Sequence, residues 1–278
     1  MMTPYEMTRT VLFAPASRPE RFAKACNSGA DVVVIDLEDG VAPTDKDTAR
    51  EALQQYLDAT PEAALVVRIN AADTKEFSAD LELCRQQRAV VAIMLAKAES
   101  VEAVQLVTDT HKAVWPLIET ARGVVEMSRM AEVDGVERFC LGALDMGADL
   151  RIKPDSAGAE LLLNRIRCDL VIYSKAAGLN APIETVCPSI EDEKAVERLA
   201  RQACEMGFGG MLCIHPRQLS PIHRGFYPDE AEILWARKVL LGARNGESVF
   251  KVDGRMVDAP VIQQANLILR AVGNAGDV

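Results

Sequence analysis

Residues 31–39 read Asp-Val-Val-Val-Ile-Asp-Leu-Glu-Asp, an apolar run that ends in acidic side chains. Apolar residues that follow one another without alternation are typical of a parallel strand buried on both faces. Similar short runs rich in Val, Ile and Leu recur along the chain, separated by longer amphipathic segments. The eight predicted strands are Thr10–Ala14, Asp31–Leu37, Ala64–Ile69, Val90–Leu95, Val114–Ile118, Arg138–Leu144, Ala181–Val186 and Gly210–Ile214.

The segments between these runs carry helix signals. Arg18–Asn27 begins beside Ser17 and Pro19, which favour a helix start, and is followed by Gly29, a typical stop. Asp45–Asp58 and Glu191–Met206 show apolar stripes at helical spacing. Eight strand-plus-helix units predict an α/β fold, a (β/α)8 TIM barrel. The alternative is an open doubly wound sheet, which we disfavour because no glycine-rich phosphate loop follows the first strand.

The end of the chain has a different pattern. Asp253-Gly254 lies between two short β-like runs, as in a hairpin, and helical patterns flank it on both sides. The predicted order is helix Asp229–Arg244, hairpin Ser248–Asp258 and helix Ala259–Val272. We therefore assign residues 1–226 to the barrel with the catalytic site and residues 227–278 to an extension. This extension can cap its own barrel or reach a neighbouring subunit.

Composition and charge exclude several classes of protein. The chain has 278 residues, 49% hydrophobic and 26% charged, as in ordinary globular proteins. A formal net charge of −10 disfavours nucleic acid and anionic membranes as partners. Seven cysteines without a C-x-x-C motif indicate reduced thiols rather than disulfides or a zinc site. Without a signal-peptide pattern or an apolar run of about 20 residues, we expect a cytoplasmic protein.

Charged and polar side chains follow several of the predicted strands. Barrel enzymes build their active sites from residues at the C-terminal ends of the strands, so these side chains are expected to meet at one rim. They come from at least five strands, which favours a catalytic role. The residues are Asp36, Glu38, Asp39, Arg68, Asn70, Lys97, Glu119, Asp145 and His215.

Glu119 and Asp145 form the sharpest pair, because they follow neighbouring strands. Two carboxylates with open positions suit Mg²⁺, and Mn²⁺ is possible, since Mg²⁺ keeps several waters and takes substrate oxygens as further ligands. The alternative is that both cap neighbouring helices or pair with arginines. The three histidines form no H-x-x-x-H pattern, so a zinc site is not expected.

Arg68 is the candidate for holding an anionic substrate. A guanidinium at a barrel mouth can bind a carboxylate through two parallel hydrogen bonds. Its alternative is an ion pair with Asp36 or Glu38, and both can hold together. Lys97 carries less weight, because a lysine at a strand end is often a solvated rim residue. His215 is interpreted as part of a turn.

Seven motifs, in order between residues 11 and 258, resemble those of the citrate lyase β-subunit-like family. This family belongs to the HpcH/HpaI aldolase superfamily, which is related to malyl-CoA and citramalyl-CoA lyases. Each motif is weak alone, but together they are specific. The motifs are Leu12–Phe22, Ser28–Asp31, Asp36–Asp39, Val67–Asn70, Pro116–Thr120, Ile214–Pro216 and Asp253–Asp258.

The resemblance implies a magnesium-dependent lyase and a role for each site residue. Glu119 and Asp145 would be the metal ligands, with Glu38 nearby. Arg68 would hold the oxoacid or polarise the thioester oxygen. Asp258 would act as an acid or base in a neighbouring subunit's site. Arg18 and Lys24 would contact coenzyme A. A homotrimer or higher homo-oligomer is expected.

The reaction implied by the resemblance is cleavage of a 3-hydroxyacyl-CoA into acetyl-CoA and a 2-oxoacid. Citramalyl-CoA, malyl-CoA and citryl-CoA are the candidate substrates, with a slight preference for the first. One alternative is a β-subunit of a citrate lyase complex that acts on a carrier-bound substrate. Others are a metal aldolase on free hydroxy-acids and a catalytically silent metal- or CoA-binding protein. Intact Arg68, Glu119, Asp145 and Asp258 argue against the silent protein.

Overall fold

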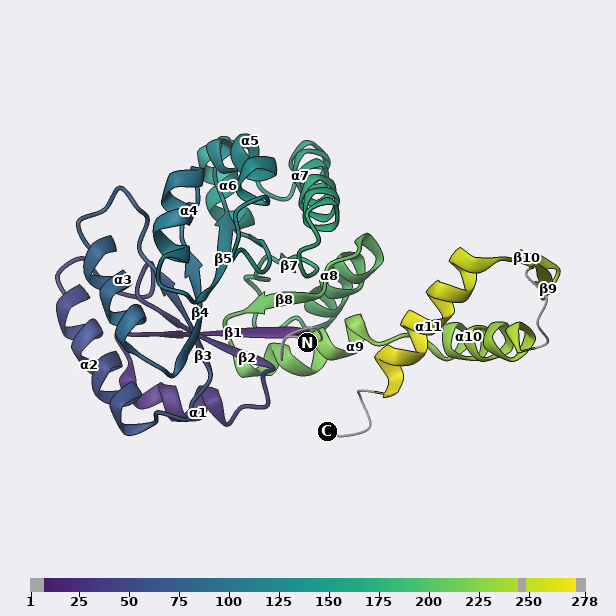
Figure 1. The fold of residues 1–278 in the computed structure, drawn as a ribbon, viewed down its shortest axis with the longest axis horizontal. Helices are drawn as coiled ribbons and strands as arrows, with labels where there is room; N and C mark the ends of the chain where they lie inside the picture. Colours follow the sequence, from purple (N-terminus) through teal and green to yellow (C-terminus); the bar gives the residue numbers. More distant parts are fainter. Residues whose placement is uncertain (1–7, 245–248, 274–278) are drawn as a thin grey trace. The chain divides into compact units, whose positions relative to one another are not determined.

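Eight parallel strands form a closed barrel in the order of the sequence (Figure 1). The computed structural model describes residues 8–244 and 249–273. Pairing of the first strand with the last closes the sheet, so the barrel is confirmed and the open doubly wound sheet is wrong. The strands are β1 (Thr10–Pro15), β2 (Val32–Asp36), β3 (Leu65–Ile69), β4 (Val90–Leu95), β5 (Ala113–Ile118), β6 (Cys140–Leu141), β7 (Ile183–Glu184) and β8 (Gly210–Cys213).

Two strands are shorter than the sequence predicts. The predicted runs Arg138–Leu144 and Ala181–Val186 contain only two strand residues each, in β6 and β7. The run at β6 is cut short because a helix begins at Ala143, one residue after Gly142. Apolar residues continue into that helix and disguise the boundary. The other six predicted strands agree with the structure to within one residue at either end.

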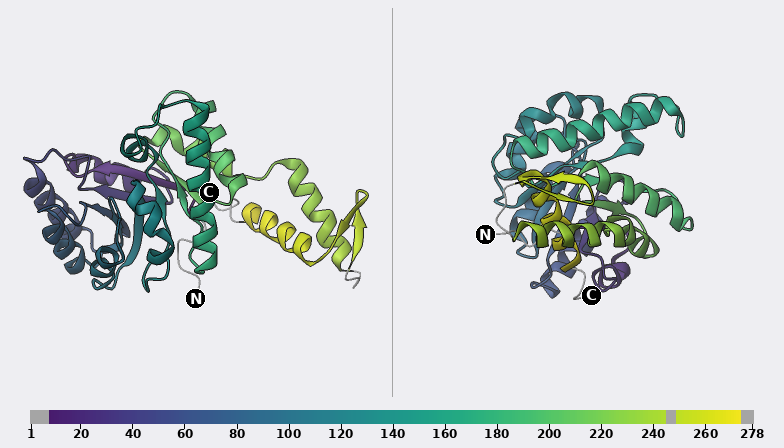
Figure 2. Two further views of the ribbon diagram at one scale, coloured as in Figure 1. Left: turned by 90° about the horizontal axis from the view of Figure 1, so that it is seen from above. Right: turned by 90° about the vertical axis from the view of Figure 1, so that its right-hand side faces the viewer.

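Helices cover the outside of the strands (Figure 2). Ser100, Thr120, Ser156 and Asp192 cap four of them by accepting a hydrogen bond from a first-turn amide. The helix predicted over Arg18–Asn27 is a 3-10 turn followed by a short α-helix. The elements are η1 (Pro19–Arg21), α1 (Phe22–Cys26), α2 (Lys46–Ala59), α3 (Phe77–Gln86), α4 (Val101–Thr108), α5 (Ala121–Met130), α6 (Ala143–Asp149), α7 (Ala157–Ala176), α8 (Glu193–Met206), η2 (Pro216–Gln218) and α9 (Leu219–Phe226).

Apolar side chains from all eight strands fill the barrel interior. Trp115 is the largest of them and is fully buried. Because the interior is packed, a substrate has access only at the rim of the barrel. The interior cluster comprises Val11, Val32, Val34, Val66, Ala92, Met94, Trp115, Leu117, Cys140, Ile183 and Leu212.

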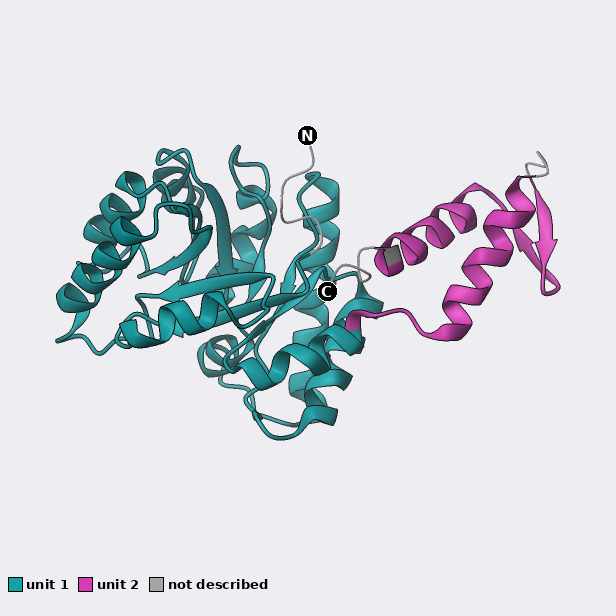
Figure 3. Cartoon of the chain, turned by 90° about the horizontal axis from the view of Figure 1, so that it is seen from below, with its two compact units in different colours: residues 1–225 teal, residues 226–278 magenta. Residues whose placement is uncertain are grey.

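The chain divides into two compact units, residues 1–225 and 226–278 (Figure 3). The second contains α10 (Glu230–Ala243), β9 (Phe250–Val252), β10 (Arg255–Val257) and α11 (Ala259–Gly273). This is the predicted helix–hairpin–helix, although Ser248, the first residue of the predicted hairpin, lies outside the described residues. The capping of a neighbouring subunit by this unit stays a prediction.

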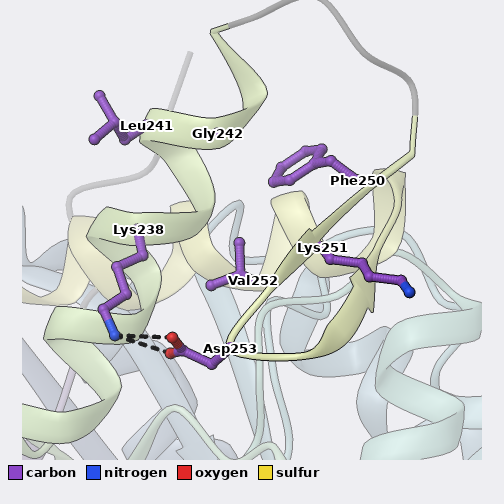
Figure 4. A pocket seen from close by; sticks show the side chains of 7 residues that line it. All are labelled: Lys238, Leu241, Gly242, Phe250, Lys251, Val252 and Asp253. Carbon is purple, nitrogen blue, oxygen red and sulfur yellow. Dashed lines mark hydrogen bonds and ion pairs between the residues drawn. The ribbon is translucent and has the colours of Figure 1, made fainter.

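The hairpin turn explains the Asp-Gly pair in the sequence. Asp253 has φ of 47° and Gly254 has φ of 79°, and a two-residue turn with both values positive matches the twist of its strands. Lys238 of α10 donates hydrogen bonds of 3.1 and 2.9 Å to the Asp253 carboxylate (Figure 4). Both side chains are more than half exposed, so this pair adds little stability.

No helix within residues 8–244 and 249–273 is long and apolar enough to cross a bilayer.

Substitution of Gly210 by alanine should destabilise the barrel at its closing seam. A Cβ atom there would lie 2.0 Å from the carbonyl oxygen of Thr8, a backbone atom that cannot move without disturbing the strand pairing. We expect a loss of roughly 1–3 kcal/mol or more in the free energy of unfolding, measured by urea denaturation. The control is Gly158→Ala at an exposed position of α7, where a Cβ atom would lie no closer than 4.0 Å to another residue's atoms. Equal stabilities of the two variants would contradict a steric requirement for glycine at position 210.

Candidate active site

A cavity of about 200 Å³ opens at the C-terminal ends of the barrel strands. Its lining combines apolar side chains with five charged ones. This arrangement can hold an organic anion with both its polar and its apolar parts in contact. The lining residues are Phe13, Asp36, Asp39, Arg68, Leu117, Glu119, Leu141, Gly142, Leu144, Asp145, Thr185, Val186, Leu212 and Ile214.

Arg68 and Asp36, two of the charged lining residues, form an ion pair through two parallel hydrogen bonds. Arg68 Nε lies 2.7 Å from Asp36 Oδ1, and Nη2 lies 2.8 Å from Oδ2. Burial opposes ionisation of Asp36, but the charge and hydrogen bonds of Arg68 outweigh it and lower the pKa of that carboxyl. Burial likewise opposes the charge of Arg68, and Asp36 with Glu38 raises its pKa. Arg68 is therefore a permanent cation, and the predicted ion pair is confirmed.

Glu38 connects two cations at the same rim. Its Oε2 lies 3.1 Å from Arg68 Nη1, and its Oε1 accepts a short hydrogen bond from Lys97 Nζ. Burial opposes the charge of Lys97, but the hydrogen bond and charge of Glu38 outweigh it, so the pKa of Lys97 is raised. The Lys97 ammonium also lies 3.9 Å from Asp145 Oδ1. Lys97 is thus part of the charged network rather than a solvated rim residue.

Lys97 also holds Glu119 through its backbone. Its φ of 45° is in the left-handed region, which is costly for a residue with a side chain and is found mostly where function demands it. In that conformation the Lys97 amide donates a 2.8 Å hydrogen bond to Glu119 Oε1. The sequence contains no signal for this strain, because Lys is not a residue that favours positive φ.

Glu119 is the most buried carboxylate facing the cavity, with 1% of the residue exposed. Burial is the main cause that raises its pKa, to about 8, and the charges of Glu38 and Asp145 add to the effect. Gly142 makes room for it: a Cβ at Gly142 would lie 2.5 Å from Glu119 Oε2. The surroundings of Glu119 therefore contain too little positive charge to stabilise its ionised form.

The sequence predicts Asp145 at the end of a strand, but in the structure this residue lies in the first turn of α6. The positive end of the helix dipole favours a carboxylate at that position. Its side chain is 39% exposed and lines the same cavity as Glu119. Thr185 Oγ1 supports this turn by accepting a 3.0 Å hydrogen bond from the Ala143 amide.

The donor set suits a hard divalent cation with open positions. Within the described part of the chain, no group of three or more His, Cys, Asp or Glu side chains could hold a metal. Zinc requires three or four protein ligands, so the arrangement does not suit it. Mg²⁺ is commonly bound by one or two carboxylates together with water and substrate oxygens. Glu119 and Asp145 fit that description, and a bound cation would stabilise the ionised carboxylate of Glu119.

Within the first unit, three predicted site residues do not line the cavity: Arg18, Lys24 and Glu38, which contacts the lining residue Arg68. Asp258 lies in the second unit at the start of α11, where its Oδ1 accepts a 3.4 Å hydrogen bond from the Val261 amide. Arg18 and Lys24 are exposed in the segment that follows β1. Their proposed contacts with a substrate remain predictions.

The sequence analysis named Asn70 but missed the buried polar network to which it belongs. Lys46, at the first position of α2, donates from Nζ to two backbone carbonyls and to Asn70 Oδ1. Asn70 in turn donates to Asp80, which pairs with Arg50 at 2.8 Å. Lysine and arginine on a helix usually mark a solvated face, so their spacing in the sequence concealed this role.

Comparisons with known proteins show what this chain is similar to. Residues 9–216 match the HpcH/HpaI aldolase/citrate lyase family. A citrate lyase subunit beta-like protein from Mycobacterium tuberculosis is 38% identical over 269 residues, 95% of each chain. A (3S)-malyl-CoA thioesterase from Cereibacter sphaeroides is 30% identical over 261 residues, 90% of this chain and 89% of its own. The crystal structure of CitE from Mycobacterium tuberculosis with magnesium, acetoacetate and coenzyme A has a TM-score of 0.86 at 36% identity, covering 96% of this chain and 98% of that chain.

Replacement of Glu119 by glutamine should change how stability depends on pH. The folded protein favours the protonated carboxyl up to about pH 8, whereas the unfolded chain releases that proton near 4.5. Between these values the native state binds more protons, so Glu119 lowers stability as pH rises. In metal-free buffer, the stability advantage of Glu119→Gln over the wild type should therefore grow across this window. Urea unfolding at several pH values measures it, and parallel curves would show that Glu119 ionises freely.

Proposed function

The chain belongs to the HpcH/HpaI aldolase/citrate lyase family, and on that premise we propose that it is a magnesium-dependent carbon–carbon lyase. Its substrate would be a 3-hydroxyacyl-CoA, namely citramalyl-CoA, malyl-CoA or citryl-CoA, cleaved into acetyl-CoA and a 2-oxoacid. The observation that carries the proposal is one cavity that combines the permanent cation Arg68 with the carboxylates Glu119 and Asp145. The M. tuberculosis relative, whose structure holds magnesium and coenzyme A, supports it.

Cleavage of a 3-hydroxy thioester places demands that these residues can meet. The hydroxyl must lose a proton, and negative charge then develops on the thioester as the carbon–carbon bond breaks. Preorganised positive charge at the oxygens that gain negative charge lowers the barrier. Mg²⁺ held by Glu119 and Asp145 would supply Lewis acidity for the hydroxyl and carboxylate oxygens.

Arg68 would hold the carboxylate of the 2-oxoacid part. Its Nε and Nη2 donate to Asp36, and Nη1 faces Glu38, which fixes the plane of the guanidinium. A guanidinium has five N–H donors, so further donors remain for a substrate carboxylate. The Arg68 guanidinium carbon lies 4.9 Å from the centroid of the Phe13 ring, so this ring limits the movement of the guanidinium. Arg68 is thereby oriented before the substrate arrives.

Glu38 would keep the two cations at fixed positions. It contacts both Arg68 and Lys97, so one buried carboxylate sets the distance between two positive groups. A substrate whose charge changes during the reaction would then meet groups that need little reorganisation. We assign Glu38 to the catalytic set on this basis.

Asp258 would act in the site of a neighbouring subunit of a homo-oligomer, as the base that takes the proton of the substrate hydroxyl and then, in its protonated form, as the acid that protonates the leaving enolate. General acid catalysis by a carboxyl group is suited to that step. The second unit exposes several large apolar side chains, which supports a subunit contact because isolated chains rarely leave many of them in water. These are Leu234, Leu241, Met256 and Leu267, each more than half exposed.

Arg18 and Lys24 would contact the phosphates of coenzyme A. Both are exposed cations that follow β1 in a chain with a formal net charge of −10. Local positive charge is needed there to attract a polyanion.

Assays of citramalyl-, malyl- and citryl-CoA, each with Mg²⁺ and with EDTA, test the reaction. We expect release of acetyl-CoA and a 2-oxoacid from one thioester, only with metal. The variant Asp145→Asn should lose about 100-fold or more in kcat, because it weakens a ligand of the catalytic cation. Its control is Asp134→Asn, an exposed change in the loop that precedes β6.

Each other outcome contradicts a part of this proposal. Release of free CoA with an intact hydroxy-acid would mean thioester hydrolysis, as the name of the Cereibacter relative describes. Cleavage of free hydroxy-acids without CoA would mean an aldolase. Inactivity on all free thioesters would favour a carrier-dependent subunit or a binding protein. Full activity of Asp145→Asn would refute the metal assignment.

Complementation between two inactive variants tests the role of Asp258. Glu119→Gln and Asp258→Ala should each be inactive, for different reasons. If Asp258 serves a neighbouring subunit, co-expressed variants will form some sites that contain both native residues. Random 1:1 mixing predicts roughly a quarter of the wild-type activity, since each site draws on two independent subunits. Mixed oligomers without any activity would place Asp258 in its own subunit's site, and an active Asp258→Ala variant would place it outside the mechanism.

A further inference from the structure

Lys46 is an ammonium group in an unfavourable place. It occupies the first position of α2, where the helix dipole is positive and disfavours a cation. The residue is also buried, with only 9% of its surface exposed, and a buried charge loses its hydration. Local interactions must offset both costs, and they show what the residue does.

All three N–H donors of Lys46 have an acceptor. Nζ lies 2.7 Å from the carbonyl oxygen of Leu37, 2.7 Å from that of Glu38 and 2.6 Å from Asn70 Oδ1. An ammonium has three donors and no acceptor, so its hydrogen-bonding capacity is full. Two of the three contacts are to the backbone of the segment that follows β2.

Asn70 is itself held, so the third contact is not free to move. Its Nδ2 donates to Asp80 Oδ2 at 2.6 Å and to the Leu37 carbonyl at 3.0 Å. Asp80 is fully buried and also accepts from the Asn70 amide and from Arg50. The network therefore connects α2, α3 and β3 to one loop.

The peptide between Leu37 and Glu38 is fixed on both sides. Lys46 binds its carbonyl, and Asp36 Oδ1 accepts its N–H at 2.9 Å. Asp36 Oδ2 also accepts the Gly40 amide at 2.7 Å. A cation thus holds the carbonyls of this segment and an anion holds its amides. The Glu38 side chain leaves the backbone in one defined direction, toward Arg68 and Lys97.

We propose that Lys46 is a positioning residue of the active site, acting through the backbone of Glu38. It does not line the cavity. Its ammonium fixes the two carbonyls so that the Glu38 carboxylate reaches both Arg68 and Lys97. The kinetic part of this inference rests on the proposed lyase function.

The variant Lys46→Met tests this role, because it keeps most of the unbranched side chain and removes its charge and donors. We expect kcat to fall about 10- to 100-fold, the range found when outer-shell partners of a site are lost. KM for the thioester should change by less than about threefold, since Lys46 touches no substrate. A purely structural role would lower the melting temperature and leave kcat unchanged in the folded enzyme.

Lys112→Met is the matched control. Lys112 Nζ donates a 2.9 Å hydrogen bond to the Gln87 carbonyl, so the variant loses the same type of contact. It lies just before β5, at the end of the barrel opposite to the cavity. We expect a kcat within about twofold of the wild type, because no site residue depends on that carbonyl.

Hydrogen exchange gives a readout that does not require activity. The Glu38 and Gly40 amides should exchange at least about tenfold faster in Lys46→Met and not in Lys112→Met, because the loop then opens more often. If Lys46→Met does not fold, Lys46→Gln, which keeps N–H donors without the charge, should show smaller changes in the same direction.

Three results would overturn the proposal: a wild-type kcat in folded Lys46→Met, unchanged protection of the loop, or equal effects in Lys112→Met. If the wild-type protein cleaves no thioester, the proposed function fails, and the exchange experiment still decides whether Lys46 holds the loop.

Discussion

Hydrogen bonding between β1 and β8 closes the barrel and makes the rest of the molecule possible. Val11 pairs with Leu212 at this seam, and Gly210 leaves space for the Thr8 backbone. In a closed parallel sheet, all strands deliver their C-terminal ends to one rim. Side chains that are 59 residues apart, such as Glu38 and Lys97, therefore meet there. An open sheet would have spread the same residues along one edge.

The charges at this rim divide the carboxylates into two kinds. Asp36 accepts hydrogen bonds from Arg68 and from two amides, so it is held ionised and serves to orient its neighbours. Glu119 is buried close to other carboxylates and holds its proton more tightly than usual. The first kind organises the loop and the guanidinium, and the second leaves an attraction for a cation. One small cavity thus combines a rigidly held Asp36–Arg68 pair with a carboxylate, Glu119, that a cation would stabilise.

Local patterns predicted the frame of the site well. Arg68, Glu119 and the acidic residues after β2 follow long apolar runs, and such runs report burial without any knowledge of the tertiary structure. Asp145 was predicted at a strand end but lies in α6, because apolar residues continue from β6 into the helix. The distinction between strand and helix there depends on the pairing of β6 with its neighbours, which periodicity does not report.

The sequence by itself determined the order of strands and helices, the rim on which charged residues gather and the family to which the motifs belong. Tertiary structure alone decided how those residues act on one another. The positive φ of Lys97, the contact of Gly142 with Glu119 and the three hydrogen bonds of Lys46 depend on segments brought together by folding. Local sequence encodes burial and helix or strand preference, whereas distances between side chains from different strands arise only when the barrel closes.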